Sequence, residues 1–358
     1  MKKILFSLGL VTFISLSAAA GKRKNKIPVL EPVPPQEAQR PDPHGQKYWY
    51  FPAMNILEAW QMTYGSPHTA IAVIDSGIHY NHPDLRPALF ENSAEIPFNG
   101  IDDDRNGFVD DYIGWNFNEG GPLPFDDNGH GTFIASIIAA QRSNGEGGMG
   151  ICPLCRLVSL RFLDADGAGD DEDLLKSIDY ATRMGVKIMN ISTAGEGYDR
   201  DLHNALRRAE AKDILVVVSS GNDGDSNDKY GIYPANFEMD NLMTVGSTDQ
   251  SGKWWENANY SPTKVHIAAP GENLWGAWPD GKWYTGNGTS FSTPIVAAIA
   301  GLVRSVNPQL TAAQTKQILM RTASVIPALK SKCASSGIVN AFRAVECARD
   351  PRLPCLSR

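Results

Sequence analysis

Three small reactive side chains occur along the chain, each on a turn that contains glycine. Asp75 begins Asp-Ser-Gly after an apolar run, His130 stands between two glycines, and Ser290 follows Gly-Asn-Gly-Thr. Taken singly, each has an ordinary structural explanation: the aspartate as a turn or helix cap, the histidine as a turn residue and the serine as a helix N-cap. Together they supply the parts of a nucleophilic catalyst, in which an imidazole takes the hydroxyl proton and an acid orients the imidazole.

These turns lie where predicted strands and helices meet. The predicted strands have the nearly continuous apolar runs of parallel strands that are covered on both faces; they are 69–74, 157–162, 188–192, 214–219, 243–247 and 266–268. The predicted helices between them are 56–60, 131–141, 172–184, 201–212, 291–306 and 312–323. This alternation predicts an α/β fold with a doubly wound, mainly parallel sheet and helices on both faces, whose functional loops gather at the carboxyl ends of the strands. Pro294 falls in the first turns of a predicted helix, where we expect it to cost no hydrogen bond.

The order of the three motifs separates this chain from other serine hydrolases. The α/β-hydrolases place the serine first and chymotrypsin-like enzymes place the histidine first, whereas here the acid comes first. With Asn-His-Pro-Asp-Leu at 81–85, the motifs resemble those of the subtilisin-like serine protease family over roughly residues 49–345. The resemblance implies a subtilisin-like fold and a serine endopeptidase with the triad Asp75, His130 and Ser290.

The resemblance also assigns residues around the triad. Asn222, in Ser-Ser-Gly-Asn-Asp-Gly, looks like the family's oxyanion donor and would act alongside the Ser290 backbone N–H, although Gly-Asn is also an ordinary turn. Other segments look like those that flank an extended peptide substrate, which would pair with them as an added strand. The substrate-binding residues expected there are Gly167, Ala168, Gly169, Ser192, Thr193, Ala194, Gly195, Ser220 and Gly221.

An acidic stretch at 102–111 has oxygen-bearing side chains at alternating positions and a glycine, the spacing that wraps a hard cation such as Ca²⁺. It departs from the EF-hand pattern, because Ile113 stands at the twelfth position in place of a bidentate glutamate. A solvated acidic loop is the alternative, but such a loop would not need Gly107. We predict a structural calcium ion with side-chain or backbone oxygens from Asp102, Asp104, Asn106, Phe108, Asp110 and Asp111.

The N-terminus has the pattern of an export signal. Lysines at 2 and 3 precede an apolar run at 4–16 and small residues at 17–20, which predicts a signal peptide over 1–20 and a secreted or periplasmic protein. A membrane anchor is the alternative, but this run is shorter than the roughly 20 apolar residues that a span needs, and we expect no span later in the chain. Residues 21–44 are rich in proline and charge and predict an extended or disordered leader. A peptidase domain over 45–348 and a tail over 349–358 would follow.

Size and composition restrict the class further. With 358 residues and 42% hydrophobic content, the chain can bury a large core without a metal or many disulfides. Its formal charge is −7 and becomes more negative without residues 1–20, because they contain lysines and no acids. This acidity argues against nucleic acid as a partner. We expect a monomer that acts on protein or peptide substrates.

The five cysteines are few for an exported chain of this length. Cys152 and Cys155 are spaced to close a small loop, and two of Cys333, Cys347 and Cys355 to close another, which leaves one thiol. A zinc site is the alternative, but no histidine lies near either cluster.

We therefore expect a secreted serine endopeptidase that works through an acyl-enzyme. One alternative is a catalytically silent relative that binds peptides, because a preserved fold does not prove turnover. Its sequence would lack a triad or oxyanion residue, and none is missing. The other alternative is an esterase or acyltransferase with the same triad.

Overall fold

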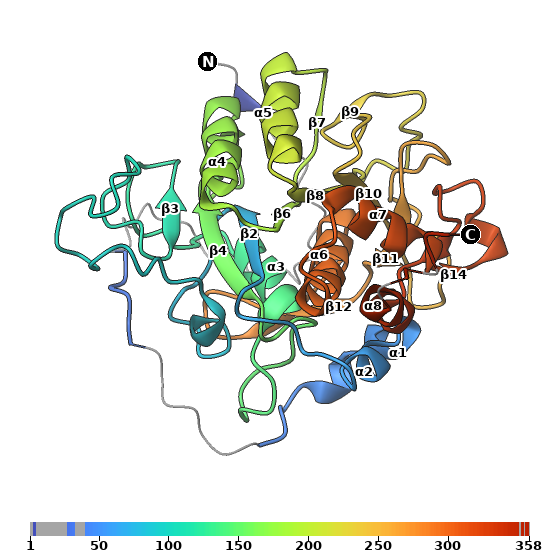
Figure 1. Cartoon of the computed structure of the whole chain (residues 1–358), viewed down its shortest axis with the longest axis horizontal. Coiled ribbons are helices and arrows are strands. Elements are labelled where there is room, and N and C mark those ends of the chain that lie inside the picture. The colour runs from blue at the N-terminus through green and yellow to red at the C-terminus, as the bar shows by residue number, and fades with distance from the viewer. Residues whose placement is uncertain (1–2, 5–26, 33–39, 351, 354, 358) are drawn as a thin grey trace, which may run out of the picture.

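The computed structural model describes residues 3–4, 27–32, 40–350, 352–353 and 355–357, and in this part of the chain the central element is a nine-stranded sheet (Figure 1). Its strands are β2 (Ala70–Asp75), β3 (Gly114–Asn116), β4 (Arg156–Arg161), β6 (Ile188–Ile191), β8 (Leu215–Ser219), β10 (Leu242–Thr248), β11 (Ile267–Pro270), β14 (Ser324–Val325) and β15 (Gly337–Ile338). Their order is β14-β15-β11-β10-β8-β6-β2-β4-β3, and every pair is parallel except the edge pair β14–β15. The predicted α/β fold with a mainly parallel sheet is confirmed.

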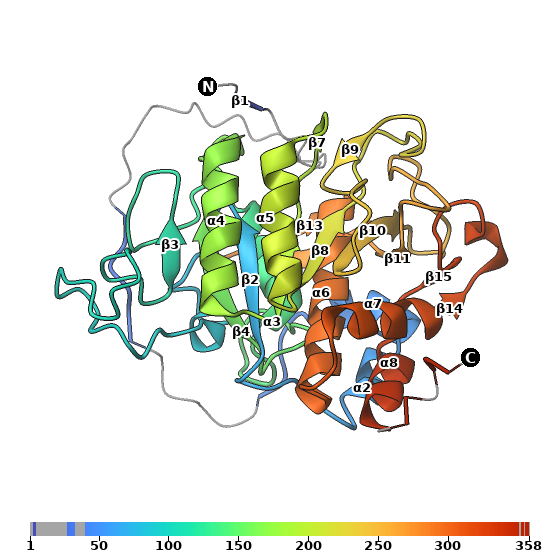
Figure 2. The same cartoon turned by 45° about the horizontal axis from the view of Figure 1, so that its top comes forward.

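Helices cover both faces of this sheet (Figure 2). They are α1 (Tyr50–Ala53), α2 (Ile56–Ala59), α3 (His130–Ala139), α4 (Asp171–Met184), α5 (Arg200–Ala211), α6 (Thr289–Val306), α7 (Ala312–Arg321) and α8 (Ala341–Arg349). Short 3-10 turns occur at Gly45–Lys47, Arg86–Ala88 and Pro327–Leu329. Helices α4 and α5 lie side by side on one face, and α3 and α6 pack together on the other.

Strand β2 shows why the buried strands are apolar throughout. Ile71 and Val73 join the hydrophobic core that includes α3 and α6, whereas Ala72 and Ile74 join the core that includes α4 and α5. Successive side chains of a strand point to opposite faces, so a strand between two cores needs apolar residues at every position.

Smaller antiparallel pairs extend the edges of the domain. They are β1 (Lys3–Ile4) with β5 (Gly169–Asp170), β7 (Gly195–Glu196) with β9 (Ile232–Tyr233), and β12 (Leu274–Ala277) with β13 (Trp283–Gly286). Apart from Lys3 and Ile4, the predicted signal peptide over 1–20 lies outside the described residues.

Part of the predicted leader is bound to the domain. Residues 27–32 are described, and their main chain is held by the loop after β2. The side-chain amide of Asn81 donates to the carbonyl of Val29 (2.7 Å) and accepts from the N–H of Glu31 (2.8 Å). Nε of Arg86 donates to the carbonyl of Glu31 (2.7 Å). Residues 27–32 are therefore attached to the domain; leader residues 21–26 and 33–39 lie outside the described residues.

Two disulfides join cysteines that are close in sequence. Cys152 bonds Cys155 and Cys347 bonds Cys355, while Cys333 is a buried thiol. The expected small loop, the expected C-terminal bridge and the one remaining thiol are all confirmed.

Among the described residues, α6 is the one helix that is long and apolar enough to cross a membrane by length and composition. It is 89% buried inside the fold.

Candidate active site

The three motif residues lie at the point where the winding of the sheet reverses. In the sheet, β2 lies between β4 and β6. From β2 the chain crosses toward β4 and β3, whereas from β6 it crosses in the opposite direction, toward β8 and β10, so the loops after β2 and β6 diverge at this point. Asp75 is the last residue of β2, His130 is the first residue of α3 and Ser290 lies in the first turn of α6. The fold therefore brings three distant motifs to one place.

The acid and the imidazole are in direct contact. Nδ1 of His130 lies 2.8 Å from Oδ1 of Asp75, and both side chains are buried. Because a carboxylate only accepts, Nδ1 carries the proton of this bond and Nε2 is left with its lone pair. The imidazole ring lies 5.4 Å from the ring of Phe291, which follows Ser290. Its unprotonated nitrogen is thus held beside the first turn of α6.

Burial and charge act on His130 in opposite directions. Burial alone would lower the pKa of the imidazole, but the charge and hydrogen bond of Asp75 and the charge of Asp126 outweigh it, so the pKa lies above its usual 6.5. Two nearby carboxylates therefore favour the protonated form of the His130 imidazole.

Glycine allows the Asp75 turn and the His130 helix to touch. A Cβ on Gly131 would lie 2.1 Å from the carbonyl oxygen of Gly77. Gly129, at the N-cap of α3, has φ +112°, and a Cβ there would lie 2.3 Å from the ring of Trp278. Any other residue at position 131 would push the two motifs apart, and any other residue at position 129 would clash with Trp278 and strain the backbone.

The hydroxyl of Ser290 is held by the residue that follows β6. Oγ of Ser290 donates to the carbonyl of Ser192 (2.9 Å), and Nε2 of His130 has no hydrogen-bond partner among the described residues. Catalytic hydrogen bonds are often long or misaligned without substrate, so a rotation of the serine side chain would have to bring the two groups together.

Pro294 does cost a helical hydrogen bond, contrary to the sequence expectation. It lies inside α6, and its missing N–H leaves the carbonyl of Ser290 without an intrahelical donor. Oγ of Ser192 donates to that carbonyl (2.9 Å) and accepts from Nδ2 of Asn190 (2.9 Å). The freed carbonyl thus anchors the start of α6 to β6.

Asn222 is oriented by the residue that precedes Ser290. The backbone N–H and the hydroxyl of Thr289 each donate to Oδ1 of Asn222 at 2.9 Å. Since the oxygen of the amide is engaged there, its NH₂ group is directed elsewhere and has no hydrogen-bond partner among the described residues.

The predicted substrate segments leave the sheet on either side of Asp75. Gly167, Ala168 and Gly169 follow β4, and Ser192 to Gly195 follow β6, the two neighbours of β2. The turn before Gly169 is closed by Asp164, whose N–H donates to the carbonyl of Ala168 (2.7 Å) and whose carboxylate accepts from the Ala168 N–H (2.9 Å). Ser220 and Gly221 follow β8 and lead directly into Asn222.

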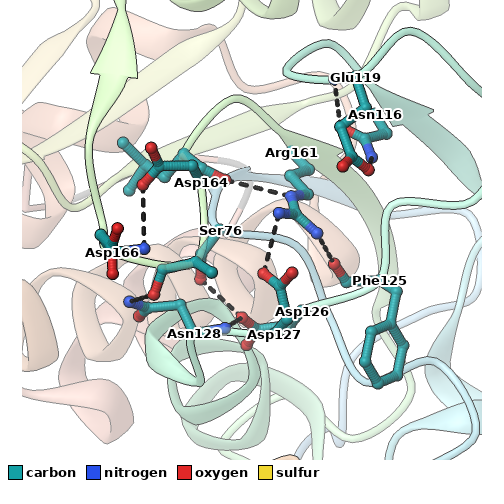
Figure 3. Close-up of polar contacts among 12 residues, drawn as sticks. Ser76, Asn116, Glu119, Phe125, Asp126, Asp127, Asn128, Arg161, Asp164 and Asp166 are labelled. Carbon is teal, nitrogen blue, oxygen red and sulfur yellow. Dashed lines mark hydrogen bonds and ion pairs between the residues drawn. The ribbon is translucent and has the colours of Figure 1, made fainter. Parts of the chain in front are cut away.

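A buried arginine ties one of these segments to the residues before His130 (Figure 3). Arg161, the last residue of β4, forms an ion pair with Asp127 (2.9 Å) and donates from Nε to the carbonyl of Leu163 (3.1 Å). It also donates to the carbonyl of Phe125. These bonds hold the loop that follows β4 against the loop that precedes α3.

Some of the predicted calcium ligands in the acidic stretch lie close together in the structure. Carboxylate oxygens of Glu95, Asp104 and Asp111 all lie within 4.8 Å of one another. Nδ2 of Asn92 donates to Asp104 (3.0 Å) and to Asp111 (3.1 Å), and Nδ2 of Asn106 donates to the same two carboxylates. Asp104, Asn106 and Asp111 were predicted from the sequence, whereas Asn92 and Glu95 were missed.

Other predicted ligands have structural partners. Asp102 accepts from the backbone N–H groups of Asn106 (3.0 Å) and Gly107 (2.8 Å) and so closes the turn. The two carboxylate oxygens of Asp110 accept from the N–H groups of residues 99 and 100. The ring of Phe108 packs edge-on against Tyr180.

Comparison with known proteins agrees with this geometry. The sequence profile of the subtilase family matches residues 66–344. The chain belongs to the subtilase family. Among similar subtilases, subtilisin-like protease 1 of Plasmodium vivax is 35% identical over 302 residues, which cover 79% of this chain and 48% of that protein. This chain therefore spans about half the length of that relative.

Two further relatives match over their whole length. Thermitase of Thermoactinomyces vulgaris is 30% identical over 306 residues, covering 85% of this chain and 98% of thermitase. The solved structure of a protease from Pseudoalteromonas arctica has a TM-score of 0.72 at 24% identity and covers 87% of this chain and 100% of that one. The second likeness supports the subtilase fold.

Proposed function

We propose that this subtilase is a serine endopeptidase that hydrolyses peptide bonds through an acyl-enzyme. The observation that carries the proposal is the buried contact of 2.8 Å between Asp75 and His130, beside the first turn of α6, which contains Ser290. Ser290 would be the nucleophile, His130 the general base and then the general acid, and Asp75 the group that orients the imidazole.

Each residue has a defined role in the reaction. His130 takes the proton of Ser290 as Oγ attacks the substrate carbonyl, because a neutral hydroxyl is a weak nucleophile. The amide NH₂ of Asn222 and the Ser290 backbone N–H would donate to the developing oxyanion. His130 then gives its proton to the leaving amine, and water repeats the sequence to release the acyl group.

Main-chain pairing would hold the substrate. An extended peptide would lie between Gly167–Gly169 and Ser192–Gly195 as an added strand. The antiparallel pairing of Lys3–Ile4 with Gly169–Asp170 supports this, because a strand of this chain already pairs with that edge. We infer that residues 1–20 are an export signal, whose removal from a secreted or periplasmic enzyme would free that edge.

A structural calcium ion fits the acidic cluster. Glu95 and Asp111 are buried, and Asp104 lies with them, so three carboxylates converge, and the groups that donate to them are amides and the hydroxyl of Tyr180. Hard oxygen donors of this kind suit Ca²⁺, which would neutralise the repulsion and fix the loop. Glu95, Asp104 and Asp111 would hold the ion, and it would take no part in peptide hydrolysis.

The first test compares the parent with Ser290→Ala for casein cleavage and for labelling by a fluorophosphonate in the presence of calcium. We expect the parent to cleave and to be labelled, and Ser290→Ala to lose at least about 10⁴-fold in activity and all labelling. Ser292→Ala is the matched control, because the Ser292 hydroxyl is engaged by the carbonyls of Ala269 and Pro270. A folded parent that neither cleaves nor is labelled would favour the silent peptide-binding alternative.

A further inference from the structure

A second carboxylate, which the reaction above does not use, lies buried beside the triad. Asp126 is fully buried, four residues before His130. Both of its oxygens are occupied by donors: Ser76 Oγ (2.9 Å), Asn128 N (3.0 Å), Gly129 N (2.7 Å), Thr132 N (2.8 Å) and Thr132 Oγ1 (2.6 Å). This is more hydrogen bonding than a helix cap requires.

The donors belong to the two segments that carry the acid and the base. Ser76 follows Asp75 directly, and its contact with Asp126 is visible in Figure 3. Oγ of Ser76 also accepts from the N–H of Gly131 (3.0 Å), one residue beyond His130. The carboxylate of Asp126 and the hydroxyl of Ser76 thus join the end of β2 to the first turn of α3 on both sides of His130.

Burial and hydrogen bonding act on the Asp126 carboxyl in opposite directions. Burial has the larger effect and raises the pKa of this carboxyl above its usual value, while the hydrogen bonds from Thr132, Gly129 and Ser76 act to lower it. Backbone N–H groups at the start of α3 donate to it, and they favour a negative charge at that position. A neutral amide would offer these donors one acceptor oxygen in place of two.

We propose that Asp126 is a positioning residue for peptide hydrolysis, which fixes His130 against Asp75 and supplies a second negative charge that stabilises the imidazolium. This proposal rests on the proposed function. Two charged groups face the imidazole, Asp75 from β2 and Asp126 from the loop before α3, and both raise the pKa of His130. From α6 the neighbours are Ser290 and Phe291, which carry no charge.

The decisive variant is Asp126→Asn, which removes the charge and one acceptor oxygen. We expect kcat to fall about 10–100-fold with KM within about threefold, because a displaced base slows the chemistry more than binding. At the same time the acid limb of kcat/KM should move to lower pH by about half a unit, because loss of a negative charge lowers the pKa of the imidazole. A merely structural defect would lower the plateau and leave the limb in place.

Asp127→Asn is the matched control. Asp127 is the next acid in sequence, but its side chain is 39% exposed and paired with Arg161, outside the hydrogen bonds that hold His130. Its removal should leave the acid limb where it is. Active sites are counted by burst titration, so that a smaller folded fraction is not mistaken for a lower kcat.

Ser76→Ala separates position from charge. It breaks the link between Asp126 and the N–H of Gly131 but keeps the carboxylate. We expect kcat to fall several-fold, roughly the effect of one misplaced contact, with the acid limb unchanged. If Asp126→Asn fails to fold, a Ser76→Ala enzyme with the parent's kcat overturns the proposal.

The imidazole can also be titrated without turnover. In a Ser290→Ala background, NMR should find a lower pKa for His130 when Asp126 is replaced by asparagine, and the same pKa when Asp127 is replaced. An inactive parent would refute the proposed peptidase, whereas an unchanged His130 titration together with an unchanged kcat would overturn the role of Asp126.

Discussion

Carboxylates form clusters in two regions of this subtilase, and the two clusters differ in the groups that surround them. Asp75 and Asp126 lie at the proposed active site and accept hydrogen bonds from their surroundings. Oδ1 of Asp75 accepts from His130 and from the N–H of Ser76, and Asp126 accepts from hydroxyl and backbone groups. Oδ2 of Asp75 has no partner among the described residues. In the loop before β3, Glu95, Asp104 and Asp111 converge on one another.

The difference teaches where each region obtains its stability. A buried charge is tolerated when fixed dipoles solvate it, and such a site is complete without an added ion. Like charges that share a site repel and raise its free energy until a cation binds. The active site should therefore respond to the loss of donors through its rate, and the acidic loop should respond to the loss of a metal through its stability.

Of the effects expected in these two regions, the largest is a loss of kcat at the proposed active site. Asn222→Ala removes the proposed oxyanion donor, and Asn222→Asp keeps the acceptor for Thr289 while it loses that donor. Both should lower kcat by about 10²–10³-fold with little change in KM, which is the effect that loss of the corresponding donor has in subtilisin. Steady-state kinetics and thermal unfolding check it. A wild-type kcat in both variants would remove Asn222 from the reaction.

Removal of calcium should act on the other region. A chelator should lower the free energy of unfolding by about 3 kcal/mol for an ion present at about 100 times its Kd, which lowers Tm by several degrees. Asp111→Asn should abolish this response, because Asp111 is buried in the cluster. Asp102→Asn should retain it, because the Asp102 oxygens accept from backbone N–H groups of the turn. A parent whose Tm ignores the chelator would refute the calcium proposal.

The two regions also differ in how far the sequence could predict them. The triad motifs stand at the ends of strands and starts of helices whose apolar runs are long, so both the elements and their meeting point followed from the pattern. α3 begins at His130 and β2 ends at Asp75, within a residue of the predicted boundaries. The local sequence pattern is sufficient to predict a residue's position where that position is set by the strand or helix on which the residue lies.

Long-range contacts could not be predicted in this way. Glu95 precedes the acidic stretch and shares no spacing with it, and only the folded loop brings it to Asp111. The prediction for Pro294 was wrong because α6 begins at Thr289, which places the proline beyond the first turn of the helix. The group that donates to the freed carbonyl, Ser192, comes from the segment after β6, far away in the sequence. Helix α8 is a different case, because it is absent from the predicted helices although a local signal for it exists. Asn340, a residue type common at helix N-caps, caps it in the structure.

The smallest expected effect is a change in the free energy of unfolding at Asp104. It gives the sharpest test, because the sign of this change should reverse when calcium is bound. Asp104 is the exposed member of the acidic cluster. Without metal, Asp104→Asn should raise the free energy of unfolding by about 1 kcal/mol or less, because it removes a like charge near water. With saturating calcium the same variant should be less stable than the parent, because a ligand is lost. Thermal unfolding in chelator and in calcium measures both signs. Destabilisation of equal size in both conditions would mean that the cluster, like the active site, is already satisfied by its own donors.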